Sequence, residues 1–146
     1  MNIAQIMTPK VCTAYIHESS TVRQALEIMQ RHHYTALPVI NEDGEYVGCI
    51  TEGDFLRHMM EVGTASIRAQ ERYSIRNLYR PDFCKPLNIC ANRQEVTEVI
   101  LQQNFVPIVD DRGFFCGIVT RRSFIAFIAE ENAHLRESSA PARAQA

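Results

Sequence analysis

Residues 34–55 read YTALPVINEDGEYVGCITEGDF, and a related stretch, NFVPIVDDRGFFCGIVTRRSF, returns at residues 104–124. Five residues keep their type and order at a constant spacing of 69 positions: Pro38 and Pro107, Gly44 and Gly113, Gly48 and Gly117, Thr51 and Thr120, Phe55 and Phe124. Self-similarity at a fixed period indicates that one supersecondary unit is used twice. The sequence therefore predicts a fold made of two copies.

Each copy has the pattern strand, helix, strand, hairpin, strand, helix. In the first copy we expect strands at 11–16, 36–40 and 46–50, a helix from Thr21 to near His33, and a second helix that starts at Thr51. Thr21 and Gln24 have the spacing of a capping box. The turn at 41–44 ends in a glycine, which suits a tight hairpin. We expect the second helix to bury Phe55, Leu56 and Met59.

The second copy differs from the first by one insertion and one deletion. About two residues are inserted near 81–86, and the helix around 95–103 is about one turn shorter than its counterpart. An apolar turn precedes each copy, with Ile3, Ile6 and Met7 before the first and Ile75, Leu78 and Tyr79 before the second. Residues 63–74 either extend the preceding helix or form a linker, and we expect a frayed tail from Glu131 onward.

Composition limits the functional classes. The chain has 146 residues, of which 46% are hydrophobic and 22% charged, with a net charge of −2. These values are typical of a globular protein and give no general field for nucleic acid or membrane surfaces. The sequence contains no apolar run of membrane-spanning length and no signal-peptide pattern. We therefore expect a cytoplasmic protein that binds neither nucleic acid nor membrane.

The cysteines and histidines do not form a metal-binding pattern. There are five cysteines, and none of them are in a Cys-x-x-Cys pair. An odd number without that spacing supports neither a zinc site nor a disulfide framework. His32 and His33 have no further ligands at a useful spacing, so a surface pair at a helix end is the better interpretation.

The segments IMTP at 6–9, LPVINEDG at 37–44 and VGCITEGD at 47–54 resemble the CBS domain. Two copies in tandem, over about residues 3–129, resemble a CBS pair, or Bateman module. This resemblance implies an α/β (α+β) fold in which repeats 3–62 and 75–129 pack through their sheets with pseudo-two-fold symmetry, joined by a linker at 63–74 and followed by a flexible tail at 130–146. It also implies a cleft between the repeats that holds an adenine nucleotide, and a homodimer.

The residue chemistry agrees with such a site. Thr51 and Thr120 each stand where a strand feeds a helix, where free backbone N–H groups and the helix dipole favour an anion. The Thr hydroxyls can donate to a phosphate, and Asp54 can accept from ribose hydroxyls. The alternative is that Thr51 and Asp54 only cap the helix, a role that is worth about 1 kcal/mol without a ligand.

The second copy differs at this position, because Ser123 replaces the carboxylate and Arg121-Arg122 follows Thr120 directly. Two cations at a helix start are unfavourable unless an anion lies between them, although a solvated surface pair is the alternative. The segments 34–39 and 119–122 resemble stand-alone bacterial CBS pairs that bind cyclic di-AMP. That resemblance implies ligand contacts from Ala14, Tyr34, Thr35, Ala36, Arg121 and Arg122, and a lysine of that subgroup falls at Cys12.

The complete predicted ligand site combines these residues with apolar walls. It comprises Ala14, Tyr34, Thr35, Ala36, Pro38, Thr51, Asp54, Phe105, Val106, Thr120, Arg121, Arg122 and Ser123, with Leu37 as a further wall. The resemblance implies a non-catalytic sensor of cyclic di-AMP or of AMP, ADP or ATP, without a catalytic cofactor or metal, that signals to a separate effector protein. The alternatives are a structural dimerisation module without a ligand, and an enzyme.

Overall fold

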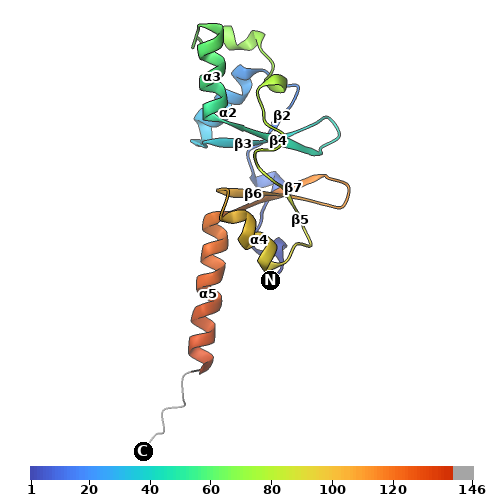
Figure 1. Cartoon of the computed structure of the whole chain (residues 1–146), viewed down its shortest axis with the longest axis vertical. Helices are drawn as coiled ribbons and strands as arrows, with labels where there is room; N and C mark the ends of the chain where they lie inside the picture. The colour runs from blue at the N-terminus through green and yellow to red at the C-terminus, as the bar shows by residue number, and fades with distance from the viewer. Residues whose placement is uncertain (140–146) are drawn as a thin grey trace, which may run out of the picture.

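The computed structural model describes residues 1–139 (Figure 1). Its helices are α1 (Ile3–Ile6), α2 (Val22–His32), α3 (Glu52–Val62), α4 (Arg93–Ile100) and α5 (Arg121–Ser139). Its strands are β1 (Thr8–Pro9), β2 (Ile16–His17), β3 (Ala36–Ile40), β4 (Tyr46–Thr51), β5 (Leu87–Asn88), β6 (Phe105–Val109) and β7 (Phe115–Thr120). Short 3-10 turns are η1 (Lys10–Cys12), η2 (Ala69–Arg72) and η3 (Ile75–Asn77).

The strands form two sheets that face each other at the middle of the molecule, with the helices on the outer sides (Figure 1). One sheet has the order β2-β3-β4 and the other the order β1-β7-β6-β5. In each, a parallel pair is followed by an antiparallel hairpin, β3–β4 or β6–β7. The predicted α/β fold of two repeats joined through their sheets is confirmed.

The repeat also holds at the level of single hydrogen bonds. The first N–H of α3, from Glu52, donates to the carbonyl oxygen of Thr35 at 3.0 Å, and the first N–H of α5, from Arg121, donates to Asn104 at 2.9 Å. The two hairpin turns both need a left-handed residue, with φ of 82° at Gly44 and 84° at Gly113. The two copies therefore share their backbone geometry as well as their sequence pattern.

The apolar turn before each repeat packs into the core of the other repeat. Ile3 is buried in the core around Val96, Ile108 and Val119, whereas Ile75 is buried in the core around Val22, Leu37 and Ile50. The strand pairing crosses in the same way. Thr8 pairs with Ile118, and Arg80 pairs with Cys49. Each repeat thus supplies a core residue and a paired backbone segment to the other repeat.

These crossings explain why β4 and β7 each contain a glycine at the equivalent position, Gly48 and Gly117. A Cβ atom on Gly48 would lie 2.7 Å from the carbonyl oxygen of Arg80, and one on Gly117 would meet the carbonyl oxygen of Thr8. Both are backbone atoms held by the pairing, so they cannot move away easily. A glycine inside a strand predicts that another group approaches the backbone closely, and here that group is the segment that crosses from the other repeat, at Arg80 or at Thr8.

Several sequence predictions are confirmed. Helix α2 begins with the expected capping box between Thr21 and Gln24. The hairpin strands lie at the expected places. Helix α4 has 8 residues where α2 has 11, as the shortened pattern predicts. Gly63, with φ of 76°, ends α3, so the segment 63–74 does not extend that helix and instead contains η2.

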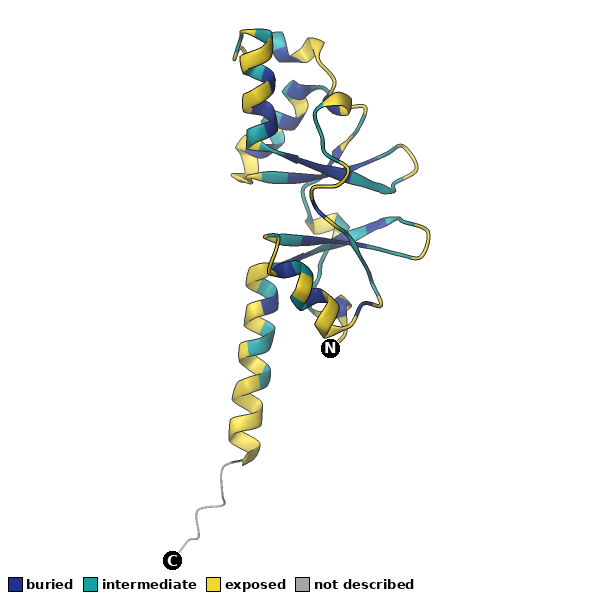
Figure 2. Ribbon diagram, viewed as in Figure 1, coloured by how far each residue is buried: buried dark blue, intermediate teal, exposed yellow. Residues whose placement is uncertain are grey.

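Other predictions are wrong. Residues 11–16 do not form one strand, because they contain the end of η1 and only the first residue of β2. Leu56 is 60% exposed and is therefore not on the buried face of α3. The tail expected to fray from Glu131 is helical as far as Ser139, and its remaining part, 140–146, lies outside the described residues. Figure 2 shows that the last turns of α5 are exposed and project away from both sheets. Within residues 1–139, no helix combines the length and apolarity that a membrane crossing requires.

Candidate functional site

A cavity of about 230 Å³ lies between the two repeats. The first repeat contributes Ala14, Tyr34, Thr35, Ala36 and Pro38, and the second contributes Phe105 and Thr120. Seven of the predicted site residues thus come together in one place. The wall is completed by five residues that sequence reasoning did not select: Thr8, Cys12, Thr13, Asn104 and Ile118.

The walls of this cavity suit a flat aromatic group. Ala14 and Ala36 leave room because their side chains are small, and Phe105 supplies an aromatic surface. The ring of Tyr34 is 45% exposed and stacks on His32 with 5.4 Å between ring centroids and 10° between planes. That stack covers one face and orients the ring. Aromatic side chains of this kind bind bases by stacking.

The helix start beside the cavity is already hydrogen-bonded within the chain. The Thr120 N–H donates to Ser123 Oγ at 3.1 Å, and the Ser123 N–H donates to Thr120 Oγ1 at 3.0 Å. The Arg121 N–H donates to Asn104. The expected free N–H groups are therefore absent at these three residues. Ser123 acts as a cap, and the Thr120 hydroxyl is the polar group of this helix start that lines the cavity.

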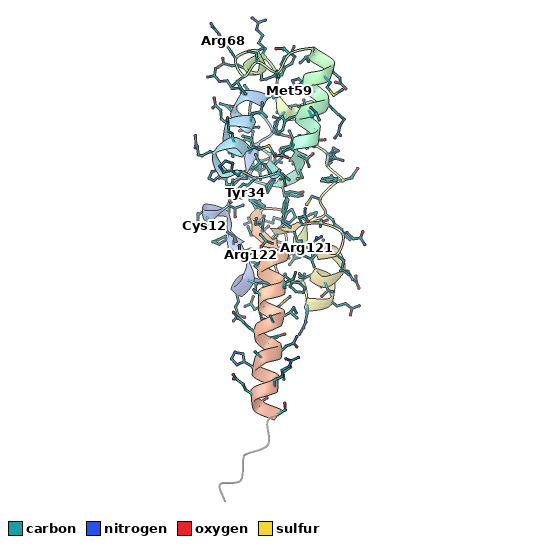
Figure 3. The ribbon with its side chains drawn as sticks, turned by 90° about the vertical axis from the view of Figure 1, so that its left-hand side faces the viewer. Cys12, Tyr34, Met59, Arg68, Arg121 and Arg122 are labelled. Atoms are coloured by element: carbon teal, nitrogen blue, oxygen red, sulfur yellow. The ribbon has the colours of Figure 1, made fainter. Side chains whose placement is uncertain are left out.

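The sequence predicts that Arg121 and Arg122 clamp a ligand together, but in this structure their side chains lie on different sides of α5. Arg121 donates from Nε to the Ile100 carbonyl oxygen and from a terminal nitrogen to that of Gln103, both at 3.2 Å. It thereby caps the end of α4 and does not line the cavity. Figure 3 shows Arg122 on the side of α5 that faces Cys12, with Arg121 on the other side. Arg122 is exposed. Like Arg121 it does not line the cavity.

Thr51 and Asp54 do not line the cavity. They stand at the positions that the repeat relates to Thr120 and Ser123, and we call the region around them the opposite cleft. The carboxylate of Asp54 is 4% exposed. Its Oδ2 accepts from the Thr51 N–H at 2.8 Å and from the Thr51 hydroxyl at 2.9 Å. The Asp54 N–H in turn donates to Thr51 Oγ1, so both halves of a capping box are present. Thr51 and Asp54 therefore cap the start of α3.

Two predicted wall residues do not reach the ligand space. The side chains of Leu37 and Val106 have no exposed surface and belong to the two hydrophobic cores. Strand alternation explains this result, because Ala36 and Phe105 face the cleft and the next residue must face the core. Among the missed residues, Thr8 could have been found from its place in the crossing segment, and Cys12 from the lysine of the resembling proteins.

The cysteines are separate thiols. Cys12 and Cys90 are exposed, whereas Cys49 and Cys84 are buried near each other. A hydrogen bond with Cys84 and burial together raise the pKa of the Cys49 thiol far above its usual value. Residues 1–139 contain no group of three His, Cys, Asp or Glu side chains that could hold a metal ion.

Comparison with known proteins finds a family match for the first copy. Residues 3–61 match the family model of the CBS domain. The homoserine O-acetyltransferase of Methanococcoides burtonii is 27% identical over 118 residues, which are 81% of this chain and 22% of that enzyme. The chain spans about a fifth of the length of the first two curated relatives it matches.

Solved structures extend the match to the whole fold. The structure of CbpB in complex with cyclic di-AMP has a TM-score of 0.84 at 18% identity, covering 94% of this chain and 91% of that chain. The structure of CBSX2 in complex with AMP has a TM-score of 0.73 at 23% identity, covering 90% and 98%. Residues 3–61 are therefore similar to the CBS domain, and the chain as a whole shares the fold of these solved structures.

Proposed function

We propose that this protein is a non-catalytic sensor that binds an adenine nucleotide in the cavity between its repeats and signals to a separate effector protein. The observation that carries the proposal is the composition of the cavity wall. Both repeats contribute to one mostly apolar space, and Thr120 is among the hydroxyl side chains that line it. A ligand there would contact both repeats at once, so its binding would favour one relative placement of them.

The pose follows from the chemistry of the walls. The base lies between Ala36, Phe105 and the ring of Tyr34, and the phosphate lies toward Thr120 and Arg122. A hydroxyl donates to phosphate, and an arginine fork binds it with two hydrogen bonds. Such a pose uses Arg122 alone, because Arg121 is held by the carbonyl groups at the end of α4.

The size of the cavity bears on which nucleotide binds. At about 230 Å³ it is smaller than the roughly 300–1,000 Å³ of ordinary ligand pockets. It accommodates one nucleoside unit, as AMP, ADP or ATP would supply. With cyclic di-AMP, the second nucleoside would lie outside the cavity, over the surface that carries Arg122. CbpB and CBSX2, which share the fold, were solved with cyclic di-AMP and AMP respectively.

Isothermal titration calorimetry with AMP, ATP and cyclic di-AMP tests this function. The informative variant is Thr120→Val, and the matched control is Thr51→Val, which removes the equivalent hydroxyl from the opposite cleft. Both lose a cap, but only Thr120→Val should weaken binding, by about 1 kcal/mol for one hydrogen bond. If the folded wild type binds none of the three, the chain is a structural module instead. Turnover of a nucleotide would favour an enzyme.

We also propose that the sensor is a homodimer. Each repeat has an apolar groove between its two helices, and the grooves match residue for residue: Phe55, Leu56 and Met59 in one correspond to Phe124, Ile125 and Ile128 in the other. Leu56 is 60% exposed and Ile125 59% exposed. Two matched grooves on one chain suit a second copy, because a two-fold interface needs a self-complementary surface.

A further inference from the structure

The opposite cleft has the same backbone plan as the cavity but contains an arginine at the decisive position. Thr51 and Thr120 correspond, and so do Arg80 and Thr8, because each of these last two pairs with the matching strand of the neighbouring repeat. Thr8 pairs with Ile118, and Arg80 pairs with Cys49 through two backbone hydrogen bonds of 2.9 and 3.2 Å. A short side chain therefore borders one cleft where a long cation borders the other.

The guanidinium of Arg80 is held on three sides. A terminal nitrogen donates to Thr51 Oγ1 at 3.4 Å. Its Nε lies 3.0 Å from Asp54 Oδ1, as an ion pair whose N–H is not aligned for a hydrogen bond. Its central carbon lies 3.8 Å from the centroid of the Phe83 ring. These are a hydroxyl, a carboxylate and an aromatic face, which are the groups that would contact a phosphate, a ribose and a base.

Three acceptor positions of the Asp54 carboxylate are filled within the chain, and the guanidinium of Arg80 lies against the remaining one. A carboxylate offers about four lone-pair sites. Oδ2 takes the N–H and the hydroxyl of Thr51, while Oδ1 contacts Arg57 at 2.6 Å and Arg80 at 3.0 Å. A nucleoside could bind here only by displacing Arg80.

The loop that carries Phe83 is also fixed. Gln103 donates to the Lys85 carbonyl oxygen at 3.0 Å and accepts from the Lys85 N–H at 3.1 Å. By the repeat spacing of 69, Gln103 stands where Tyr34 stands in the cavity. The aromatic wall of the opposite cleft is thus provided by Phe83, and the face of its ring is covered by Arg80.

We propose that Arg80 acts as a built-in occupant of the Thr51–Asp54 cleft, so that each chain takes up a single nucleotide, in the Thr120 cavity. The statement about the open cavity rests on the proposed function, whereas the blocking of the other cleft does not. Arg80 is in this sense a specificity-determining residue, because it decides which of two equivalent clefts is open.

The first test replaces Arg80 with threonine, the residue that stands at the equivalent position, Thr8, beside the open cavity. Arg80→Thr should raise the stoichiometry of AMP binding, measured by calorimetry, from one to two per chain. The matched control is Arg57→Thr, which removes a cation from the same carboxylate. Arg57 comes from α3 itself and its side chain is 61% exposed, so stoichiometry should stay at one. Because Arg57 remains paired with Asp54 in Arg80→Thr, the carboxylate keeps a partner and the variant should fold.

Each result of these measurements either supports or overturns the blocking role of Arg80. A wild type that binds two AMP molecules per chain overturns the proposal, as does a folded Arg80→Thr variant that gains no site, or an Arg57→Thr variant that gains one. A wild type that binds none while Arg80→Thr binds one supports the blocking role and refutes the proposed function of the open cavity.

A second variant covers the case in which Arg80→Thr does not fold. The double substitution Thr8→Arg with Ser123→Asp copies the ion pair of Arg80 and Asp54 into the open cavity. AMP affinity should fall at least tenfold, with unchanged circular dichroism. A folded double variant that binds AMP as tightly as wild type would show that a guanidinium at this position does not close a cleft, and would overturn the inference.

Discussion

The hydroxyl of Tyr46 donates a hydrogen bond of 2.6 Å to the backbone carbonyl oxygen of Cys84. The bond joins strand β4 of the first repeat to the segment that leads into the second. The neighbouring ring of Phe115 lies 6.3 Å away, centroid to centroid. By the repeat spacing, Tyr46 and Phe115 are equivalent residues, so the two repeats meet here at their pseudo-symmetry axis.

This bond gives a pH prediction. Burial raises the pKa of the Tyr46 hydroxyl well above its ordinary value of about 10. The folded state therefore favours the neutral phenol, so its stability is complete below pH 10 and declines as the pH rises beyond that value. Chemical denaturation of wild type and Tyr46→Phe should show that the phenylalanine variant is less stable at pH 7, by about 1 kcal/mol. Above pH 10 the gap should narrow, and a constant gap would contradict the assignment.

The strand glycines predict a large loss of stability. Gly48→Ala forces a Cβ atom against the Arg80 carbonyl oxygen, and we expect a cost of about 3 kcal/mol in urea denaturation. The control is Gly53→Ala in α3, where the nearest atoms belong to the flexible end of Arg57 at 3.4 Å. That variant should gain about 0.5 kcal/mol from helix propensity. Equal effects at both positions would refute the crossing-segment explanation.

The two arginines should separate in their effects. Arg122→Ala should weaken binding of cyclic di-AMP by about 1.5–3 kcal/mol, the range for a hydrogen bond to a charged group, without a change in melting temperature. Arg121→Ala should instead lower stability by about 1 kcal/mol, because it leaves the end of α4 uncapped, and should leave affinity unchanged. The reverse assignment of the two effects would mean that Arg121 leaves α4 to bind the ligand.

The two exposed thiols can report where the ligand binds. Cys12 lines the cavity and Cys90 does not, yet both are exposed. Saturating AMP or cyclic di-AMP should slow alkylation of Cys12 by iodoacetamide, as read by mass spectrometry, while Cys90 reacts at its usual rate. Cys49 should stay unmodified in both states, because it is buried and its pKa is raised. Equal protection of Cys12 and Cys90 would point to a general change of fold.

The dimer can be tested at one residue. Ile125→Asp places a charge in the groove of the second repeat, and light scattering at micromolar concentration should then give the monomer mass where wild type gives the dimer. Leu135→Asp is the matched control, because Leu135 is 66% exposed on α5 but lies outside that groove. A monomeric wild type would rule out the homodimer.

The hairpins and helix starts could be predicted from sequence because short-range rules determine them. Pro38, Gly44 and Thr51 have local reasons for their positions, and the same reasons return at Pro107, Gly113 and Thr120. The prediction of a strand at residues 11–16 was wrong for an equally local reason. The Thr13 hydroxyl donates to the carbonyl oxygens of Thr8 and Pro9, at 3.2 and 3.0 Å, and so favours a turn over a strand.

The long charged side chains could not be placed from sequence. Arg80 and Arg121 each contact several groups that only the folded chain brings near, and their long flexible side chains could point in many directions. Arg93 pairs with Glu131 at 2.6 Å and ties the polar continuation of α5 to α4. The sequence predicted fraying there because the segment leads into a Ser-, Ala- and Pro-containing end of the chain.

The exchange of the leading turns, with Ile3 in one core and Ile75 in the other, decides what can fold alone. A fragment cut after residue 62 would keep Ile3 without the core that receives it and would lack Ile75 at the centre of its own. The unit of folding is therefore the pair. Ile3 reaches Val119 and Phe124 near the other end of the described chain, and contacts of such separation form late because the closing loop is long. A chain emerging from the ribosome must hold its first strand unpaired until almost all of the rest has been made, and we expect slow refolding with a single cooperative transition.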